Sequence, residues 1–241
     1  MIGPLLNAGG IIVGGIIGLT KKNVLSPAIE AFSKAGLGAF TVFYGLRLTW
    51  ISLGGSFGHI LKQLLIVILA LMLGQVCGKL LRLQKFSNRL GQIAREKMTA
   101  AKPGEPIAAA EGFKACTILF CAAPLGILGA VEDGLSNYYY PLAVKGVIDG
   151  LATMSFISLF GWSPLMAALP VMAMQGTITL LSAQLPGNLL TPNLIQSINA
   201  TGGLLVFCVG LIVLELKKIG LADYLPALVF APLIVKMIGG W

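Results

Sequence analysis

The stretch IGPLLNAGGIIVGGIIGLT (residues 2–20) decides the class of the fold, because it runs for 19 residues without a charged side chain. A helix rises about 1.5 Å per residue, so about 20 apolar residues cross the roughly 30 Å hydrocarbon core of a bilayer. The stretch has neither the basic region nor the small-residue cleavage site of a removable signal peptide. It therefore predicts a retained first transmembrane helix.

Seven more apolar runs follow, and the composition agrees with them: 56% of the 241 residues are hydrophobic and 11% are charged, against roughly 25% charged in soluble domains. Two of the runs could instead form broken helices or re-entrant segments, since one contains Lys145 and Asp149 and the last contains two prolines. We expect an all-α integral membrane protein, a single transmembrane domain over 1–241 with about eight transmembrane helices. The predicted spans are 2–20, 35–53, 60–81, 113–131, 141–161, 164–184, 200–216 and 222–239.

The only long connection lies at residues 82–111. Its first half spaces apolar residues helically among basic ones, which is typical of an amphipathic helix on the membrane surface. Its second half, AAKPGEPIAAAEG (100–112), is rich in Ala, Pro and Gly and predicts a flexible connection.

The basic residues indicate orientation. The net charge is +8, but its residues cluster beside apolar runs rather than on a soluble face, which favours lipid headgroups over nucleic acid. The clusters follow the first, third and seventh spans, at 21–22, 79–102 and 217–218. Because such loops stay in the cytoplasm, we expect segment 82–111 inside and both termini outside.

An internal repeat links two hairpins, 2–53 and 164–216. Segments 25–46 and 190–211 align at a constant offset of 165 residues with six identities, including Gly38/Gly203 and Gly45/Gly210. An odd number of spans separates the copies, so the second hairpin would enter the membrane inverted. Inverted repeats are the usual architecture of secondary transporters. The alternative is that glycine-rich helices align by composition alone.

Glycines spaced four apart predict close helix contacts. Gly10, Gly14 and Gly18 form one stripe on the first span, and Gly74 and Gly78 form another on the third. Small residues at this spacing let two backbones approach. The partner is either another helix of the chain or another subunit, which leaves a homo-oligomer open.

Asp149 is the deepest acidic residue, and Lys145 stands four residues before it on the same helix face. Intramembrane ionisable groups are costly and mark functional sites by default. The functional interpretation is a carboxylate that binds a cation or a proton. The structural alternative is a mutually neutralised pair that faces the bundle interior.

Uncharged polar residues supply the other candidates. Gln175, Thr177 and Thr179 lie near mid-depth of the sixth span, and Asn7 lies in the first. Amide and hydroxyl oxygens beside unwound backbone are how helical transporters build sites for ions or small solutes. The alternative for each is an interhelical hydrogen bond that holds the bundle together.

Two further acidic residues, Glu132 and Asp133, are expected at the outer surface, where they end the fourth span beside three interfacial tyrosines. An acidic vestibule for cations is a second interpretation of them. The chain has one histidine and no nucleophile, phosphate-loop or dinucleotide motif, so no enzyme, metal site or cofactor is predicted. The four cysteines, which have no metal-ligand spacing, are expected to be structural thiols.

The segments NAGGIIVGGIIGLTKK (7–22), EGFKACTILFCAAPLGILGAVEDGL (111–135) and KGVIDGLATMSF (145–156) resemble the YqgA/YdfK family of uncharacterised bacterial inner-membrane proteins. So do LPVMAMQGTITLL (169–181), ATGGLLVFCVGL (200–211) and LPALVFAPLI (225–234), in the right order. The resemblance covers the whole chain. It implies a multi-pass protein of the bacterial inner membrane, in a family for which a sodium channel or pump has been suggested, and it assigns no site residues.

The pattern as a whole predicts a transporter or channel for a small ion, Na⁺- or H⁺-linked, or for a small solute. Asp149 and Gln175 are the main candidate site residues, with Lys145, Thr177, Thr179 and Asn7 around them. A scaffold that packs through its glycine stripes is one rival, and a dry, fully paired interior would favour it. A lipid-handling protein is the other, and a groove open to the bilayer would favour that.

Overall fold

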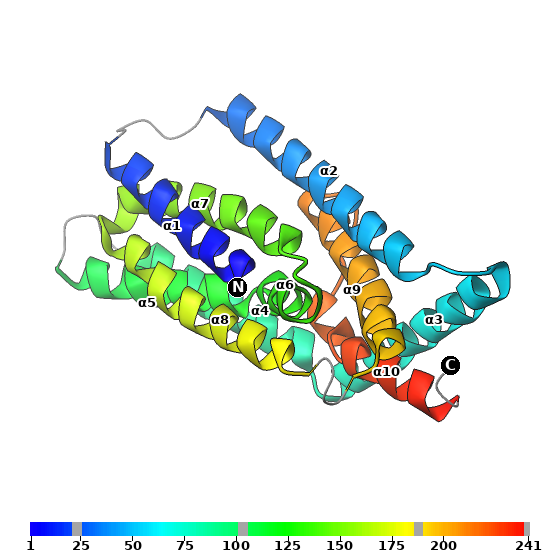
Figure 1. Ribbon diagram of the computed structural model, residues 1–241. Coiled ribbons are helices and arrows are strands. Elements are labelled where there is room, and N and C mark those ends of the chain that lie inside the picture. The colour runs from blue at the N-terminus through cyan, green and yellow to red at the C-terminus, as the bar shows by residue number, and fades with distance from the viewer. Residues whose placement is uncertain (21–25, 101–105, 186–189, 239–241) are drawn as a thin grey trace.

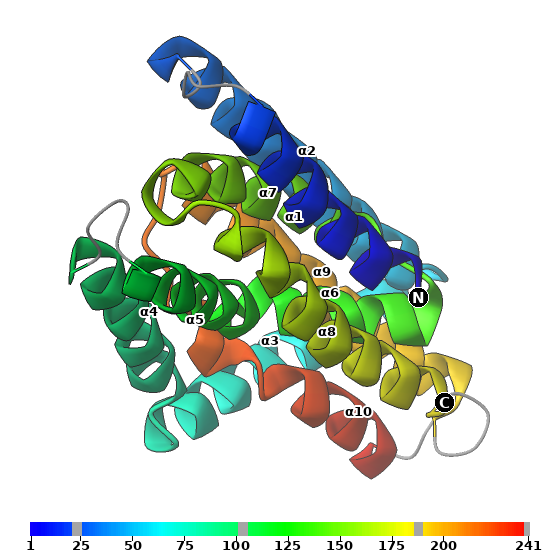
Figure 2. The ribbon, with the colours of Figure 1, turned by 90° about the vertical axis from the view of Figure 1, so that its left-hand side faces the viewer.

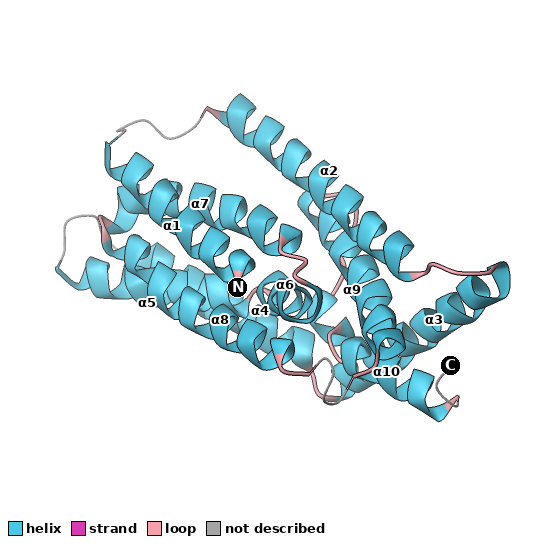
Figure 3. Ribbon diagram, in the orientation of Figure 1, coloured by secondary structure: helices cyan, strands magenta, loops and turns pink. Residues whose placement is uncertain are grey.

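The computed structural model describes residues 1–20, 26–100, 106–185 and 190–238, which fold into helices with no β-strand among them (Figure 1, Figure 3). In chain order the helices are α1 (Ile2–Thr20), α2 (Pro27–Ser52), α3 (Phe57–Leu80), α4 (Leu83–Ala100), α5 (Pro106–Ala122), α6 (Pro124–Ser136), α7 (Tyr140–Phe160), η1 (Ser163–Ala167), α8 (Ala168–Ala183), α9 (Pro192–Val213), η2 (Leu221–Tyr224) and α10 (Ala227–Met237). The two short 3-10 helices, η1 and η2, lead into α8 and α10. The prediction of an all-helical fold is confirmed.

Five helical segments in the described residues are long and apolar enough to cross a bilayer: α1, α3, α7, η1 with α8, and α9. A bent pair, α5 with α6, brings the number to six if it is one span. Two of the eight predicted spans are not among them. Helix α2, in which the span 35–53 was predicted, is long enough but not apolar enough to be counted. Helix α10, in which the span 222–239 was predicted, has only 11 residues with Pro232 inside it.

The break between α5 and α6 was not predicted, since 113–131 was expected to be one helix. The two helices meet at an angle of 57°. Pro124 lacks the N–H that would continue the α5 ladder, and it holds the preceding Ala123 in an extended conformation with φ −67° and ψ 121°. Helix α5 also starts earlier than expected, at Pro106, so the predicted flexible connection is partly helical.

Helices α1 and α7 lie side by side and run parallel (Figures 1 and 2). The glycine stripe of α1 makes this contact: a Cβ on Gly10 would lie 2.2 Å from the Gly146 carbonyl oxygen, and one on Gly14 would lie 2.0 Å from that of Gly150. Gly18 meets the carbonyl of Met154 in the same way, at 2.8 Å. The partner of the stripe is therefore another helix of the same chain.

Helices α2 and α9 form the second close pair, and they run antiparallel. Gly45 packs against the Phe207 backbone and Gly203 against that of Thr49. The second predicted stripe packs beside this pair, Gly74 against Ala227 at the start of α10 and Gly78 against Asp223 in η2. Helix α9 is the most enclosed span, with 61% of its most apolar stretch buried against 28% for α3.

The amphipathic helix predicted at the start of 82–111 is α4, which lies along α5 on the outside of the bundle (Figure 2). Its charged residues are exposed or half-buried, and Lys97 pairs with Glu111 of α5. The basic residues at 21–22 and the tip of the loop, 101–105, lie outside the described residues.

Candidate functional site

Polar side chains from three helices converge in the bundle interior, where α1, α7 and α8 meet. The Asn7 amide nitrogen donates to the Gln175 amide oxygen at 3.0 Å, and both side chains are fully buried. The Asn7 side chain also interacts with the Asp149 carboxylate. Asn7, Asp149 and Gln175, which are far apart in sequence, thus belong to one cluster.

Lys145 and Asp149 form the ion pair that their spacing predicts, one turn apart on α7. They are 2% and 5% exposed, so the pair is shielded from solvent. The lysine ammonium also lies 5.8 Å from the centre of the Phe120 ring, within the range of a cation–π contact. Each charge is therefore neutralised inside the protein, as burial requires.

Glycines let the helices come close enough for these contacts. A Cβ on Gly146 would lie 3.0 Å from the Asn7 Cα. A Cβ on Gly126, in the first turn of α6, would lie 3.0 Å from the Gln175 amide nitrogen and 3.1 Å from Cε of Lys145. The broken helix α6 therefore begins at the cluster and joins it as a fourth helix.

The beginning of α6 adds partial positive charge to the site, because the first N–H groups of a helix have no partner within it. Two polar atoms of the cluster itself also have no hydrogen-bond partner among the described residues, the Asn7 amide oxygen and the Gln175 amide nitrogen. The site thus holds one neutralised ion pair, one spare acceptor and one spare donor.

The two candidate threonines have different positions. Thr179 is buried one turn from Gln175, and its hydroxyl donates to the Ala130 carbonyl of α6 at 3.1 Å. It therefore forms an interhelical hydrogen bond. Thr177 is on the outer face of α8, exposed, and donates to Ala173 of its own helix. Thr177 therefore lies apart from the cluster, because a two-residue step on a helix turns its side chain away from Gln175.

Comparison with known proteins identifies the chain's relatives. The model of the family described as "Protein of unknown function (DUF554)" matches residues 2–236. The chain belongs to the DUF554 family.

Two curated relatives of this DUF554 protein are similar over nearly their whole length. "Uncharacterized membrane protein YdfK" of Bacillus subtilis is 28% identical over 239 residues, 99% of this chain and 97% of the relative. "Uncharacterized protein YqgA" of Escherichia coli is 28% identical over 236 residues, 96% and 94% of the two chains. No solved structure matches the chain significantly. The predicted family resemblance is confirmed, and the chain is a multi-pass membrane protein.

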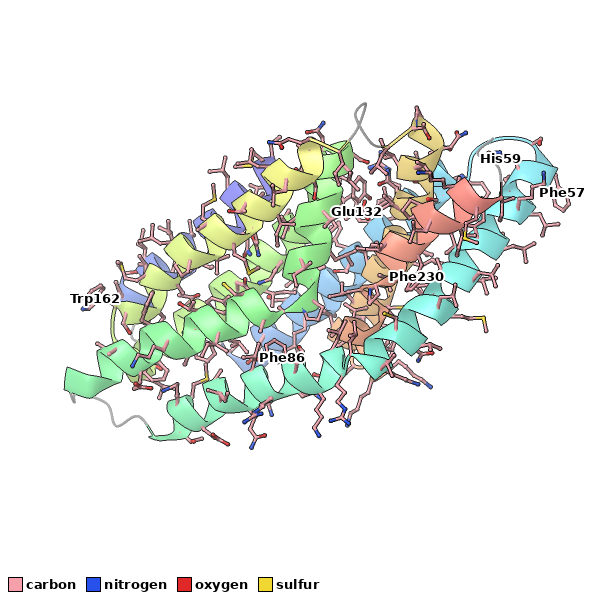
Figure 4. All side chains as sticks on the ribbon, turned by 90° about the horizontal axis from the view of Figure 1, so that it is seen from below. Phe57, His59, Phe86, Glu132, Trp162 and Phe230 are labelled. Carbon is pink, nitrogen blue, oxygen red and sulfur yellow. The ribbon has the colours of Figure 1, made fainter. Side chains whose placement is uncertain are left out.

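A second acidic site in this DUF554 chain was missed. Glu132 and Asp133, expected at the surface, are 0% and 1% exposed. Asp133 accepts from the Gly3 amide at 3.3 Å and pairs with the Met1 amino group at 2.9 Å. Glu132 faces α9 from the interior of the bundle (Figure 4). The surface prediction failed because α6 continues to Ser136 with α1 and α9 packed around its last turns.

Tyrosines in and just after the connection that follows α6 contact helix α2. The Tyr138 hydroxyl donates to the Tyr44 carbonyl of α2 at 2.7 Å. Burial raises the pKa of this hydroxyl above its ordinary value, so it is a neutral donor at all physiological pH values. Tyr140 stacks on Tyr44 with ring centres 4.1 Å apart. The tyrosines therefore join α2 to the connection between α6 and α7.

Proposed function

We propose that this protein is a transporter or channel of the bacterial inner membrane for a small ion or small polar solute. The substrate would pass the cluster of Asn7, Lys145, Asp149 and Gln175. The observation that carries the proposal is the convergence of these buried side chains on the broken helix α5–α6. Half-helix ends that point at midplane polar groups are the usual way in which helical transporters build a site.

The spare hydrogen-bonding atoms support a ligand over a purely structural role. A packing network is expected to satisfy its buried polar groups, because each orphan costs about 1–3 kcal/mol. Here the Asn7 oxygen and the Gln175 nitrogen both remain unsatisfied beside an ion pair. A small solute or a hydrated ion would supply both missing partners.

Pseudo-symmetry between α2 and α9 also supports transport. A Cβ on Gly45 would lie 2.3 Å from the Phe207 nitrogen, and one on Gly210 would lie 2.7 Å from the Val42 nitrogen. In the alignment at an offset of 165 residues, Gly45 corresponds to Gly210 and Val42 corresponds to Phe207. The two contacts are therefore equivalent, with the roles of α2 and α9 exchanged.

The Gly203–Thr49 contact has its image in Gly38–Leu214. A two-fold axis perpendicular to two antiparallel helices produces this pattern. Our proposal includes an inverted repeat, with α1 and α2 equivalent to α8 and α9 and with α2 also crossing the membrane beside α9.

Flux measurements test the function. The purified protein in liposomes would be given a panel of Na⁺, K⁺, H⁺ and small-solute gradients. We expect Lys145→Met with Asp149→Asn to remove flux while keeping the fold, because both charges are removed together. The matched control is Glu30→Gln with Lys34→Met, an exposed pair at the same spacing, 3.2 Å apart. Wild-type flux in the Lys145/Asp149 double variant, or no flux of any kind in the native protein, would reject the proposal.

A cavity favours lipid handling as a second candidate. It has a volume of about 500 Å³, lies between α4, α5, α8 and η2, and is lined mainly by apolar side chains. Phe86 of α4 lines it, whereas Phe57 at the start of α3 is exposed far from it (Figure 4). If lipid handling is the function, Phe86→Ala and not Phe57→Ala will reduce co-purified phospholipid in native mass spectra, and ion flux will be absent.

A further inference from the structure

Among the buried carboxylates of the described residues, Asp133 and Asp149 each have an ion-pair partner, whereas Glu132 has none. Its side chain is 0% exposed, and neither carboxyl oxygen has a hydrogen-bond partner in the described part of the chain. Around it lie Leu128 of its own helix and the apolar core between α6 and α9, which contains Leu205 and Val206. The carboxyl group is thus shielded from solvent and has no counter-charge among the described residues.

Helix α9 has a glycine where the carboxyl group lies. A Cβ on Gly202 would lie 1.7 Å from Glu132 Oε1 and 2.9 Å from the carboxyl carbon. No side chain larger than hydrogen fits there without displacing the carboxyl group. The glycine therefore makes a cradle for Glu132 that is independent of the glycine contacts which pair α9 with α2.

The charged groups around Glu132 are committed elsewhere. On α7, Lys145 and Asp149 pair with each other, and on α6 itself Asp133 pairs with the amino group of Met1, which precedes α1. Helix α8 contains no ionisable residue, and α9 contains only Cys208. Tyr138, which follows α6, lies close enough to Glu132 to interact electrostatically, but its hydroxyl donates to the Tyr44 carbonyl. Arg47 of α2 lies near Tyr138 and forms no ion pair with Glu132. No basic side chain in the described residues compensates this carboxylate.

We infer that Glu132 is a proton-binding site, held as the neutral carboxylic acid in this arrangement and able to release its proton when α6 and α9 separate enough to admit water. A buried carboxylate without donors is far less favourable than the protonated group, which carries no net charge. The site is distinct from the Asn7–Gln175 cluster, where the carboxyl group of Asp149 is paired with the ammonium group of Lys145.

Sodium is the competing ligand. The Asn199 amide oxygen, one turn from Gly202 on α9, also lacks a partner, while its nitrogen donates to Ser136 at 2.7 Å. One carboxylate and one amide oxygen leave most of the coordination sphere of a metal cation empty, whereas a proton needs a single oxygen. The geometry therefore favours the proton.

Infrared spectroscopy of the purified full chain tests the assignment. A protonated carboxyl group in apolar surroundings has a carbonyl band separate from the amide and carboxylate bands. Near neutral pH we expect one such band, which Glu132→Gln removes completely. Glu111→Gln, a carboxylate of α5 that pairs with Lys97 and Lys114, is the matched control and should leave the band unchanged.

Three results would overturn the inference. They are no protonated-acid band in the native protein near neutral pH, a band that persists in Glu132→Gln, and a band that Na⁺ but not choline removes at constant pH, which would assign the site to sodium. If the proposed transport function holds, Glu132 makes the flux proton-linked. The infrared measurement requires no flux, so the two proposals can fail separately.

Discussion

Asp149 and Glu132 are both carboxyl groups in the interior of the same bundle, and they are accommodated in opposite ways. Asp149 has a lysine one turn away and an asparagine from α1 beside it. Glu132 has a glycine opposite it and no donor in the described residues. The first carboxyl group is paired with a buried lysine, and the second is inferred to bind a proton. Two acidic side chains in the interior of one bundle can therefore have opposite surroundings, one with a counter-charge and one without.

The largest effect is expected where the pairing is broken. Lys145→Met leaves Asp149 buried and unpaired, which should cost about 3–5 kcal/mol of stability. Replacing both residues, with Lys145→Met and Asp149→Leu, should recover most of this loss, because no buried charge remains. Thermal unfolding in detergent, followed by circular dichroism, measures both variants. Equal stability of Lys145→Met and the native protein would show that the pair is not buried as described.

The second effect concerns the glycine opposite Glu132. Gly202→Ala should cost about 1–3 kcal/mol by overpacking, because its Cβ would collide with the Glu132 carboxyl group. Combining it with Glu132→Ala should restore much of that loss, since the second change removes the colliding group.

Gly9→Ala is the control for this measurement, as a Cβ there meets nothing within 4 Å. Additive losses in the Gly202/Glu132 double variant, measured in the same thermal assay, would indicate that the glycine has another role.

The contrast between the two carboxylates explains how much the sequence could predict. The Lys145–Asp149 pair depends on spacing within one helix, and a helix places residues four apart on one face. Asn7 and Gln175 were recognised as uncharged polar residues within apolar runs, and an interhelical hydrogen bond was one of two interpretations of each. That the two residues bond to each other across 168 positions required the fold.

Glu132 could not be placed because its burial depends on which helices surround the end of α6. The sequence showed two acids near tyrosines at the end of an apolar run, which is the pattern of an interface. The signal that was overlooked is Pro124 within that run, which breaks the span and starts a new helix. A start at Pro124 leaves Glu132 only two turns inside α6, in the packed bundle. The number of spans was also predicted too high, since the length and composition of an apolar run cannot show that α10 ends at Met237.

The third effect is smaller, and it compares the two carboxyl groups by replacing each with its amide. Glu132→Gln exchanges a neutral acid for a neutral amide of similar size, so its stability should stay within about 1 kcal/mol of the native value. Asp149→Asn instead leaves Lys145 without its counter-charge and should cost at least twice as much. Paired thermal unfolding curves near neutral pH measure the difference. A larger loss for Glu132→Gln than for Asp149→Asn would contradict the assignment of a paired and a proton-binding carboxyl group.

The last prediction decides from which side of the membrane Glu132 would exchange its proton, and it should not affect stability. Basic residues in short connections stay in the cytoplasm, and α4 carries a basic cluster, so α4 is expected inside. The α5–α6 span then carries the chain outward, which leaves the Tyr138–Tyr139 connection and the Glu132 end of α6 near the outer surface. In a cysteine-free background, Tyr139→Cys in intact cells should react with a membrane-impermeant maleimide. Gln92→Cys on the exposed face of α4 should react only after the membrane is permeabilised. The reverse result would put Glu132 near the cytoplasm, so protons would reach it from the opposite side while both carboxylate environments stayed unchanged.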